Sequence, residues 1–413
     1  MKQLIGPFKQ LLPMDLVPHK GPFRDEELHV ITEGAILIEY GLILEVGVFD
    51  EMAKEYAGEV DIIKFNEEVI CLPGFIDSHT HICYSGTRAR DFGLRNGGSS
   101  YLEIAEKGGG IWDTVTQTRL ASEHALTQNV VSRANRHLSE GVTTIEVKSG
   151  YGLSIDAELK MLRSIQSANG LSYADLISTC LAAHIKPKDF LGDNTKYLDY
   201  LMRELFPVIK AEKLTNRIDA FVEQGAFSVE EVRPYFDFAR SEGFELTVHA
   251  DQFHAGGSAL AAELGAVSAD HLEASTDKEI EILAKSNTVA TALPGASMGL
   301  GCDFTPARKL LDAGASLVIA SDWNPGSAPM GDLIMQASVL ATFQKLTNAE
   351  VLSAITCRAA QALQLDDRGV LSNGMKADFV LYQTDHYNEI LYHQGKLTPS
   401  EVWKDGSQVF KKD

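Results

Sequence analysis

Eight short runs of β-branched and other apolar residues, each followed by a stretch with helical spacing, constrain the fold of this chain more than any other feature. The runs cover 74–82, 142–150, 176–184, 217–224, 244–251, 266–272, 288–295 and 316–323. Strands that are apolar on both faces and alternate with helices are typical of a parallel sheet. Eight such units predict an α/β fold with a closed (β/α)8 barrel of the TIM type, and an open doubly wound sheet is the alternative.

Both ends of the chain lie outside this alternation. Residues 28–71 and 369–383 hold short strand-like pieces with turn glycines. Neither end is long enough to form a good domain alone, because a small unit buries too little apolar surface. We therefore predict a composite β-sandwich domain from residues 1–72 together with 366–413, beside a barrel domain that spans 73–365.

Charge and composition argue against several kinds of partner. The 413 residues include 37 Lys and Arg against 57 Asp and Glu, a formal charge of −20. This excess disfavours nucleic acid and anionic membrane surfaces, but not a small anionic substrate held by a few arginines. The sequence predicts no transmembrane helix and no signal peptide. The five cysteines are odd in number and scattered, so we expect a reducing, cytoplasmic environment.

Polar residues gather at the ends of the predicted strands, where the chemistry of such barrels takes place. In "GFIDSHTHI" (74–82), one residue separates His79 from His81, so both imidazoles would project from the same face of a strand. A single buried histidine is more often a hydrogen-bonded core residue. Here, however, several strand ends deliver an imidazole or a carboxylate to one mouth, which is costly unless these groups are paired or bind a cation. The other polar residues at these ends are Glu146, Lys148, Tyr151, His184, His249, Asp251, Gln252, Asp270, His271 and Asp322.

This arrangement predicts a divalent metal site. Two imidazoles on one strand provide half of such a site, and a third histidine and a carboxylate would complete it, with one position left for water. Nitrogen and oxygen ligands suit zinc, or another divalent ion such as iron. The function of such a site would be to lower the pKa of water to about 7, which supplies a nucleophile at neutral pH.

The order of these motifs resembles the metal-dependent amidohydrolase superfamily over nearly the whole chain. The motifs are "PGFIDSHTH" (73–81), His249, His271, "ASDWNPG" (320–326) and "GMKADFVLY" (374–382). Narrower segments resemble the imidazolonepropionase family within it: "SGTRARDF" (85–92), "EIAEKGGGI" (103–111), "EVKSGYGL" (146–153), "AAHIKP" (182–187), "HADQF" (249–253), "LGAVSADHLE" (264–273) and "SDWNPGSAP" (321–329). This resemblance implies hydrolysis of the ring C–N bond of 4-imidazolone-5-propanoate to N-formimidoyl-L-glutamate, in histidine degradation, by a homodimer.

The resemblance also implies roles for individual residues. It implies one zinc or iron ion per subunit, with the ligands His79, His81, His249 and Asp322. It implies substrate contacts by Arg88, Tyr151, His184 and Gln252, and product contacts by Asn324, Gly326 and Ser327. The catalytic group would comprise His271, Asp322, His184 and Gln252. In the expected reaction, water attacks the ring carbonyl carbon, and either Asp322 or His271 takes the water proton and one of them returns it to the ring nitrogen.

General chemistry supports three of these roles, each with a plainer alternative. Arg88, seven residues beyond His81, offers a planar charged fork to the propionate, or is a solvated surface arginine. Tyr151 lies in "SGYG", where glycines permit close approach of the backbone to a ligand, or is an ordinary turn tyrosine. His184 can donate to the ring carbonyl oxygen as charge develops there, or is a satisfied core histidine.

Gln252 and Lys148 help to distinguish the expected hydrolase from a deaminase and from an enzyme with two metals. Gln252 stands where many deaminases of the superfamily have a glutamate, and an amide cannot carry a proton, so deamination of another heterocycle is disfavoured. It also removes one candidate base for the hydrolysis itself. Lys148 is a candidate for the carboxylated lysine that bridges two metals in other branches, but "VKSGYG" resembles the one-metal branch. A catalytically inactive barrel that serves as a scaffold is disfavoured because all four expected ligands are present.

The glycine run "KGGGI" (107–111) lacks the Lys-Ser/Thr pair of a phosphate-binding loop. Together with "RNGGSS" (95–100), it is expected to form either a flexible loop over the site or a plain linker. In either case, a helix is predicted to begin after this segment, near Asp113.

Overall fold

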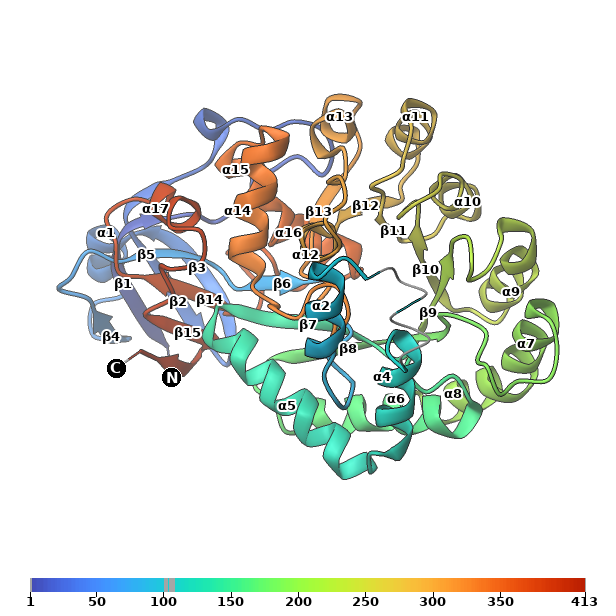
Figure 1. Cartoon of the computed structure of the whole chain (residues 1–413). Coiled ribbons are helices and arrows are strands. Elements are labelled where there is room, and N and C mark those ends of the chain that lie inside the picture. The colour runs from blue at the N-terminus through green and yellow to red at the C-terminus, as the bar shows by residue number, and fades with distance from the viewer. Residues whose placement is uncertain (1, 100–102, 104–107, 413) are drawn as a thin grey trace.

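Two eight-stranded sheets form the framework of the protein in the computed structural model, which describes residues 2–99, 103 and 108–412. The barrel sheet is parallel, and its strands follow one another in chain order (Figure 1). They are β6 (Phe75–Asp77), β7 (Val142–Lys148), β8 (Asp175–Ala183), β9 (Arg217–Val222), β10 (Glu245–Ala250), β11 (Ser268–His271), β12 (Val289–Ala292) and β13 (Leu317–Ile319). The predicted barrel is confirmed, because a doubly wound sheet would reverse its strand order.

The barrel closes through the segments that follow its first and last strands. Thr80 forms a parallel bridge with Trp323. Asp322 N donates to His79 O at 3.0 Å, and His81 N donates to Trp323 O at 2.9 Å. Strand β6 is shorter than predicted and ends two residues before the first of these histidines. The two imidazoles therefore lie beyond the strand, in backbone that is held by its pairing with the segment after β13.

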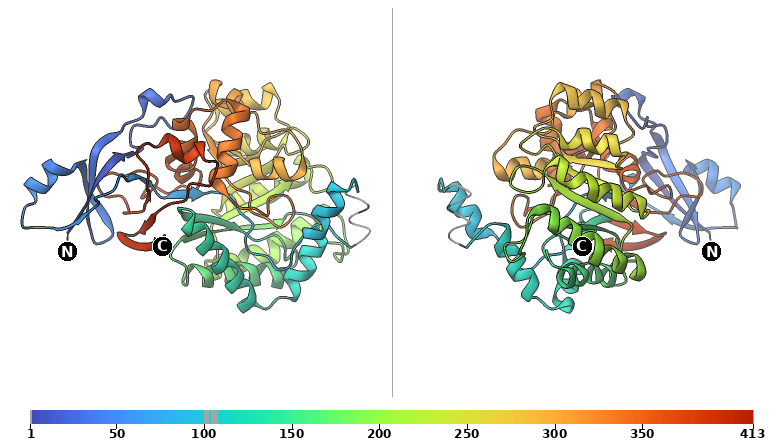
Figure 2. Two further views of the ribbon diagram at one scale, coloured as in Figure 1. Left: turned by 60° about the vertical axis from the view of Figure 1, so that its left-hand side comes forward. Right: turned by 90° about the vertical axis from the view of Figure 1, so that its right-hand side faces the viewer.

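Helices surround the barrel (Figures 1 and 2). They are α2 (Ala89–Asn96), α4 (Ile111–Leu120), α5 (Glu123–Ser139), α6 (Ile155–Asn169), α7 (Asn194–Tyr200), the π-helical η2 (Leu201–Leu205), α8 (Phe206–Glu212), α9 (Val229–Ser241), α10 (Gly257–Leu264), α11 (Asp277–Lys285), α12 (Pro294–Leu300), α13 (Ala307–Asp312), α14 (Leu333–Gln344), α15 (Asn348–Ala354) and α16 (Cys357–Ala362). The helical segment that is predicted to begin near Asp113 is divided between α4 and α5, because the Ser122 side chain accepts from Ala125 N and begins a new helix.

Both ends of the chain build the second sheet, which lies to one side of the barrel (Figures 1 and 2). Its order is β16-β15-β14-β5-β1-β2-β3, with β4 paired to β1. The sheet curves back on itself, since Ile43 N donates to Met375 O at 2.8 Å and Leu42 bridges to Lys376. The predicted small β-sandwich from both ends is confirmed, while the boundaries at 72, 73, 365 and 366 remain a prediction. Its elements are β1 (Gln3–Leu11), η1 (Asp25–Glu27), β2 (Ile31–Glu39), β3 (Leu42–Val48), α1 (Phe49–Glu55), β4 (Asp61–Lys64), β5 (Ile70–Pro73), β14 (Phe379–Tyr382), α17 (Asn388–Tyr392), β15 (Glu401–Lys404) and β16 (Ser407–Lys411).

The glycine-rich segment between α2 and α4 is described only in part. Residues 100–102 and 104–107 of the predicted loop lie outside the described residues. Gly110 precedes α4 with a φ of 78°, a conformation that favours glycine. Helix α4 begins at Ile111, two residues before the predicted start. The choice between a loop over the site and a plain linker remains a prediction.

Two findings bear on the expectations from composition. In the part of the chain that the structure describes, no helix combines the length and the apolar character that a membrane span requires. The cysteines, as their spacing predicted, are all free thiols: Cys71, Cys83, Cys180, Cys302 and Cys357.

Candidate active site

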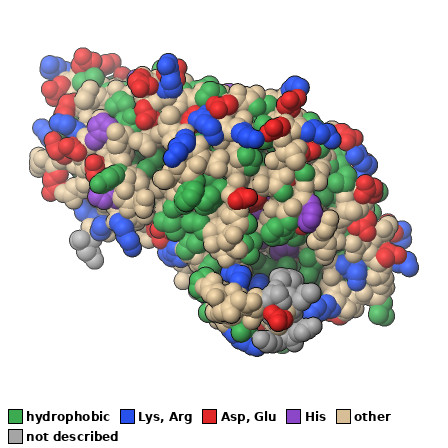
Figure 3. All heavy atoms as spheres, turned by 45° about the horizontal axis from the view of Figure 1, so that its top comes forward, with side chains coloured by type: hydrophobic (Ala, Val, Ile, Leu, Met, Phe, Trp, Pro, Cys, Tyr) green, Lys and Arg blue, Asp and Glu red, His purple; other side chains and the backbone are tan. Residues whose placement is uncertain are grey.

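Three imidazoles and one carboxylate converge at the C-terminal mouth of the barrel. His81 Nε2 lies 3.2 Å from His79 Nε2 and 3.3 Å from His249 Nε2. Asp322 Oδ1 lies 3.6 Å from His79 Nε2 and 3.4 Å from His81 Nε2. All four side chains are buried, and histidine side chains are visible in a hollow on the face drawn in Figure 3. The structure thus brings together the four residues that were expected as metal ligands.

Carboxylates hold the Nδ1 side of two of these rings. His79 Nδ1 lies 2.7 Å from Asp270 Oδ2, and His249 Nδ1 lies 2.9 Å from Asp219 Oδ2. A carboxylate at Nδ1 keeps the proton on that nitrogen, which leaves Nε2 with a free lone pair. Burial lowers the pKa of both imidazoles, so the rings are neutral near pH 7.

The spacing of these nitrogens tests whether a metal ion fits. His81 Nε2 lies 3.2 and 3.3 Å from the Nε2 atoms of His79 and His249, and a single N–H cannot satisfy both of them, whereas a cation between the rings accepts a lone pair from all three. Zinc binds imidazole nitrogen at about 2.0–2.1 Å, so two ligands of a tetrahedral site stand about 3.4 Å apart. The observed separations agree with this spacing. Three imidazoles and a carboxylate also match the donor set of zinc or non-haem iron sites, so the residues fit a divalent ion.

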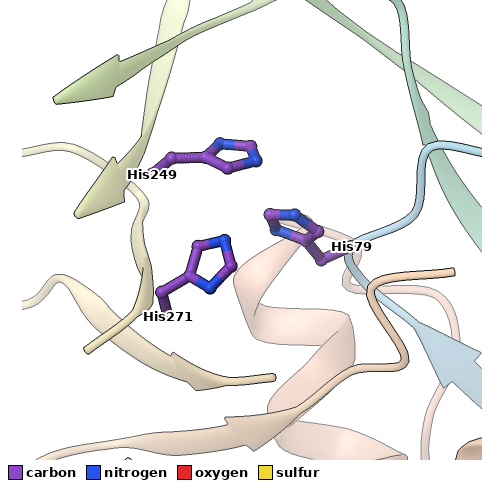
Figure 4. Close-up of side chains that lie close together, drawn as sticks. All are labelled: His79, His249 and His271. Atoms are coloured by element: carbon purple, nitrogen blue, oxygen red, sulfur yellow. The ribbon is translucent and has the colours of Figure 1, made fainter. Parts of the chain in front are cut away.

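His271 is a fourth imidazole at the same mouth. One nitrogen each of His79, His249 and His271 lies within 4.8 Å of the others, and Figure 4 shows the three rings directed toward one another. His271 Nδ1 lies 3.5 Å from Glu273 Oε1, which also accepts from Ser297 Oγ at 3.2 Å. Burial opposes a charge on this ring, but the nearby Glu273 carboxylate outweighs it, and the pKa of His271 is raised. His271 is therefore better suited to hold a proton than His79 or His249, whose pKa values are lowered.

Lys148 lies among the carboxylates that hold the imidazoles. Its Nζ is 2.8 Å from Glu146 Oε1, 3.0 Å from Asp219 Oδ2 and 3.8 Å from Asp270 Oδ2. Burial opposes the charge of the ammonium, but the three carboxylates outweigh it and raise the pKa of Lys148. A protonated amine cannot carry a carbamate. The arrangement therefore favours the expected one-metal site over a bridging carboxylated lysine.

Arg88 caps the start of α2 and faces the loop that follows the last barrel strand. Its Nε donates to Asp91 Oδ2 at 2.6 Å, and its side chain is only 12% exposed, so it is not a solvated surface arginine. A Cβ added to Gly326 would lie 2.9 Å from Arg88 Nη1, which places the guanidinium directly against this glycine. The structure thus brings together two residues, far apart in sequence, that were expected to contact substrate and product.

Tyr151 and His184 lie beside His81. The His184 ring stacks on the His81 ring with centroids 5.7 Å apart, and the Tyr151 ring lies 5.6 Å from the His184 ring. Burial lowers the pKa of His184 to about 3, so the ring is neutral. Its Nδ1 lies 3.0 Å from Gly150 O, an atom that only accepts, so Nδ1 carries the proton and Nε2 is an acceptor. This tautomer does not favour the expected donation by His184 to a ring carbonyl.

The loop after β13 is ordered by the Asn324 side chain. Asn324 Nδ2 donates to Asp322 O at 2.7 Å and to Ser327 Oγ at 2.9 Å. Asn324 Oδ1 accepts from Gly326 N at 2.7 Å and from Ser327 N at 2.8 Å. Ser327 Oγ also lies 3.4 Å from Asp322 Oδ2. Gln252, the remaining predicted contact, is half-buried in the bend after β10.

The sequence analysis missed three carboxylates that touch this site: Asp219, Glu273 and Asp91. Asp219 could have been found, because a carboxylate inside the apolar run "RIDAFV" is costly to bury without a partner. Asp251, by contrast, was expected at the mouth. Its Oδ1 accepts from Gly256 N at 2.9 Å and its Oδ2 accepts from Ser275 Oγ at 2.7 Å, so it orders the turn after β10.

Comparisons with known proteins identify relatives over nearly the full chain. The model of the Amidohydrolase family matches residues 70–409. An imidazolonepropionase from Bacillus cytotoxicus is 40% identical over 407 residues, which cover 97% of this chain and 95% of that protein. Imidazolonepropionases from Bacillus mycoides and from Bacillus cereus strain ZK are each 39% identical with the same coverage.

Solved structures show the same architecture at lower identity. An atrazine chlorohydrolase from Arthrobacter aurescens TC1, complexed with zinc, has a TM-score of 0.68 at 16% identity, covering 99% of this chain and 95% of that chain. An adenosine deaminase from Xanthomonas campestris, with bound zinc, has a TM-score of 0.70 at 17% identity, covering 99% and 93%. These likenesses show a shared fold.

Proposed function

We propose that this chain, which belongs to the amidohydrolase family and to the imidazolonepropionases within it, hydrolyses 4-imidazolone-5-propanoate to N-formimidoyl-L-glutamate. One C–N bond of the ring breaks: the hydroxyl of water joins the carbonyl carbon, and a proton joins the leaving ring nitrogen. The observation that carries this proposal is the convergence of three imidazoles and Asp322 Oδ1 at one mouth of the barrel.

We propose that one zinc or iron ion per subunit is held by His79, His81, His249 and Asp322. When bound there, such an ion supplies Lewis acidity, which polarises a carbonyl group and lowers the pKa of water to about 7. The support is the donor set and its spacing. Asp219 and Asp270, which hold Nδ1 of two of the rings, keep the Nε2 lone pairs free for ligation.

We propose that His271, rather than Asp322, moves the proton. Asp322 Oδ1 faces the ligand imidazoles, which makes it a poor base once it is a ligand itself. His271 has a buried carboxylate partner in Glu273, 3.5 Å from its Nδ1, that stabilises an imidazolium. His271 therefore takes a proton from the attacking water and returns it to the ring nitrogen as the C–N bond breaks.

Arg88 recognises the propionate in this proposal. Asp91 accepts from its Nε, and within residues 2–99, 103 and 108–412 no acceptor is seen for its Nη atoms, which we propose bind the substrate carboxylate. His184 Nε2, as an acceptor, suits an N–H of the substrate ring, and Tyr151 lies beside it. Asn324 orders the loop that brings Gly326 and Ser327 to the same place. Gln252 supplies an amide there, which suits hydrolysis without a second carboxylic acid.

We also propose that the protein acts as a homodimer in the cytoplasm. The family supports the first point, and the five free thiols, three of them buried, support a reducing compartment for the second. Sedimentation velocity on the purified protein measures the oligomeric state directly.

The test of the activity is hydrolysis of freshly prepared 4-imidazolone-5-propanoate in 18O-labelled water, with mass spectrometry of the product. The proposal predicts metal-dependent loss of the ring chromophore and one 18O atom in the new carboxylate of N-formimidoyl-L-glutamate. Absence of turnover by metal-replete protein would overturn the assignment. Release of ammonia from an amino-substituted heterocycle, with no turnover of 4-imidazolone-5-propanoate, would instead support the deaminase alternative.

A further inference from the structure

We propose that Lys148 is a positioning residue of the metal centre: its ammonium fixes the two carboxylates that orient His79 and His249, and metal binding weakens without it. Lys148 lies on β7 and is 1% exposed. It acts through other residues and does not itself contact the ligand atoms. This inference rests on the metal site proposed above, and it concerns how that site is held in shape.

The Lys148 ammonium and the imidazoles of His79 and His249 approach the same two carboxylate oxygens. Asp219 Oδ2 lies 3.0 Å from Lys148 Nζ, and the same oxygen lies 2.9 Å from His249 Nδ1. Asp270 Oδ2 lies 3.8 Å from Lys148 Nζ, and the same oxygen lies 2.7 Å from His79 Nδ1. Each of these oxygens is thus shared between the ammonium and one ligand ring.

A third connection reaches the segment that carries His79 and His81. Lys148 Nζ donates to Glu146 Oε1 at 2.8 Å, and Glu146 Oε2 accepts from Thr80 N at 3.2 Å. Thr80 Oγ1 donates to Glu146 O at 2.6 Å, and Lys148 N donates to Thr80 O at 2.9 Å. One ammonium is therefore connected, through one carboxylate each, to the rings of His79 and His249 and to the backbone of Thr80, which lies between His79 and His81.

The charges explain why this connection matters. Without Lys148, the carboxylates of Glu146, Asp219 and Asp270 would stand together in a buried region without the ammonium that lies close to all three. Their repulsion would turn the two aspartates away from the imidazoles, which would lose the partner that fixes their orientation. Loss of such outer partners typically lowers metal affinity by about 10- to 100-fold.

If Lys148 acted only through its charge, its removal would change the zinc affinity in the opposite direction. Removal of a positive charge close to a bound cation relieves repulsion and strengthens metal binding. A role in fold stability alone predicts no change in the affinity of the folded protein. The direction of the change in zinc affinity therefore separates positioning from both alternatives.

The experiment compares the full-length protein with Lys148→Met. Zinc dissociation constants are measured by competition with a chromophoric chelator, and the absorption spectrum of the cobalt-substituted protein reports the ligand geometry. The proposal predicts about 10- to 100-fold weaker zinc binding and a changed cobalt spectrum. If Lys148→Met does not fold, Lys148→Arg, which keeps the charge but displaces the donor atoms, is expected to weaken zinc binding and shift the spectrum in the same way.

Lys404→Met is the matched control. Lys404 is also a buried ammonium among carboxylates, with Nζ 3.0 Å from Asp378 Oδ2, 3.1 Å from Asp175 Oδ2 and 3.0 Å from Asp405 Oδ2, but it lies in the second sheet. Its loss should lower stability and leave the zinc affinity and the cobalt spectrum of the folded protein unchanged.

The outcomes distinguish this inference from the proposed function. Zinc binding by folded Lys148→Met that equals or exceeds that of the wild type would overturn the positioning role, as would unchanged binding and spectrum in Lys148→Arg. Failure of the wild-type protein to bind zinc or iron would overturn the metal site itself.

Discussion

The carboxylate of Asp91 joins Arg88 to the start of α4: its Oδ2 accepts from Arg88 Nε at 2.6 Å and from Gly110 N at 2.8 Å. Asp91 is 3% exposed, so neither contact competes freely with water. The pairing fixes the plane of the guanidinium. It also links the proposed propionate-binding residue to the glycine segment that precedes α4.

Asp91→Asn is expected to raise KM for 4-imidazolone-5-propanoate by about tenfold, because a charge-assisted hydrogen bond is worth about 1.5–3 kcal/mol and a tenfold change is about 1.4 kcal/mol. The value of kcat should stay close to that of the wild type, since the reacting atoms are not touched. Steady-state kinetics measure both. A large loss of kcat with an unchanged KM would place Asp91 in the chemistry instead.

Gly326→Ala tests the close approach of Arg88 to the loop after β13. The new Cβ would lie 2.9 Å from Arg88 Nη1, so the guanidinium must move. We expect a higher KM and an unchanged metal content. Gly58→Ala is a control for the general cost of replacing a glycine, because a Cβ there meets nothing within 4 Å, although its φ of 82° makes it strained. A wild-type KM in Gly326→Ala would remove Arg88 from substrate binding.

His271→Asn tests the proton transfer. Removal of a general base is expected to lower kcat by about 10²- to 10⁴-fold, while metal content is retained, because His271 is not one of the four proposed ligands. Metal analysis and kinetics on the same preparation show whether His271 transfers the proton or binds the metal. If His271→Asn loses its metal together with its activity, His271 is a ligand; if it keeps full activity, Asp322 is the proton carrier.

Much of this site could be predicted from the sequence because the proposed metal ligands lie where barrel strands end. The strand period and the order of the eight runs were enough to place His79, His81, His249 and Asp322 at one mouth. The sharing of Asp219 and Asp270 oxygens between Lys148 and two rings was not predictable, since it depends on side-chain distances across several strands.

The tautomer of His184 escaped prediction for a related reason. Its Nδ1 contact is with a backbone carbonyl, Gly150 O, and a sequence pattern does not show where a particular carbonyl points. The contact between Arg88 and Gly326 likewise depends on how two loops meet, and not on the residue types alone.

A pH prediction follows from Asp175, which joins β8 to the C-terminal part of the chain. It pairs with Arg368, with Lys376 at 3.1 Å and with Lys404 at 3.1 Å. Burial opposes ionisation of Asp175, but Lys404, Arg368 and Lys376 outweigh it and lower the pKa of Asp175 to about 2. A lowered pKa in the folded state stabilises the protein above the unfolded value of about 3.9, and the effect is lost as the pH falls toward 2.

Asp175→Asn is therefore expected to reduce the free energy of unfolding at neutral pH by about 1–2 kcal/mol, a figure that allows for solvent screening of a partly exposed pair. The difference from the wild type should be constant down to about pH 5 and smaller at about pH 3. Urea unfolding at these pH values measures it. A difference that does not change with pH would show that the carboxylate charge is not the cause.

The central claim is that three imidazoles and Asp322 hold one ion on which the ring hydrolysis depends. The most direct test is to strip the protein with a chelator, return zinc or iron stepwise, and measure turnover of 4-imidazolone-5-propanoate at each step. The account predicts that activity rises in proportion to bound metal and stops at one ion per chain, and that His249→Ala stays inactive throughout. Full turnover by stripped protein with no measurable metal, or a rise that requires two ions per chain, would contradict it.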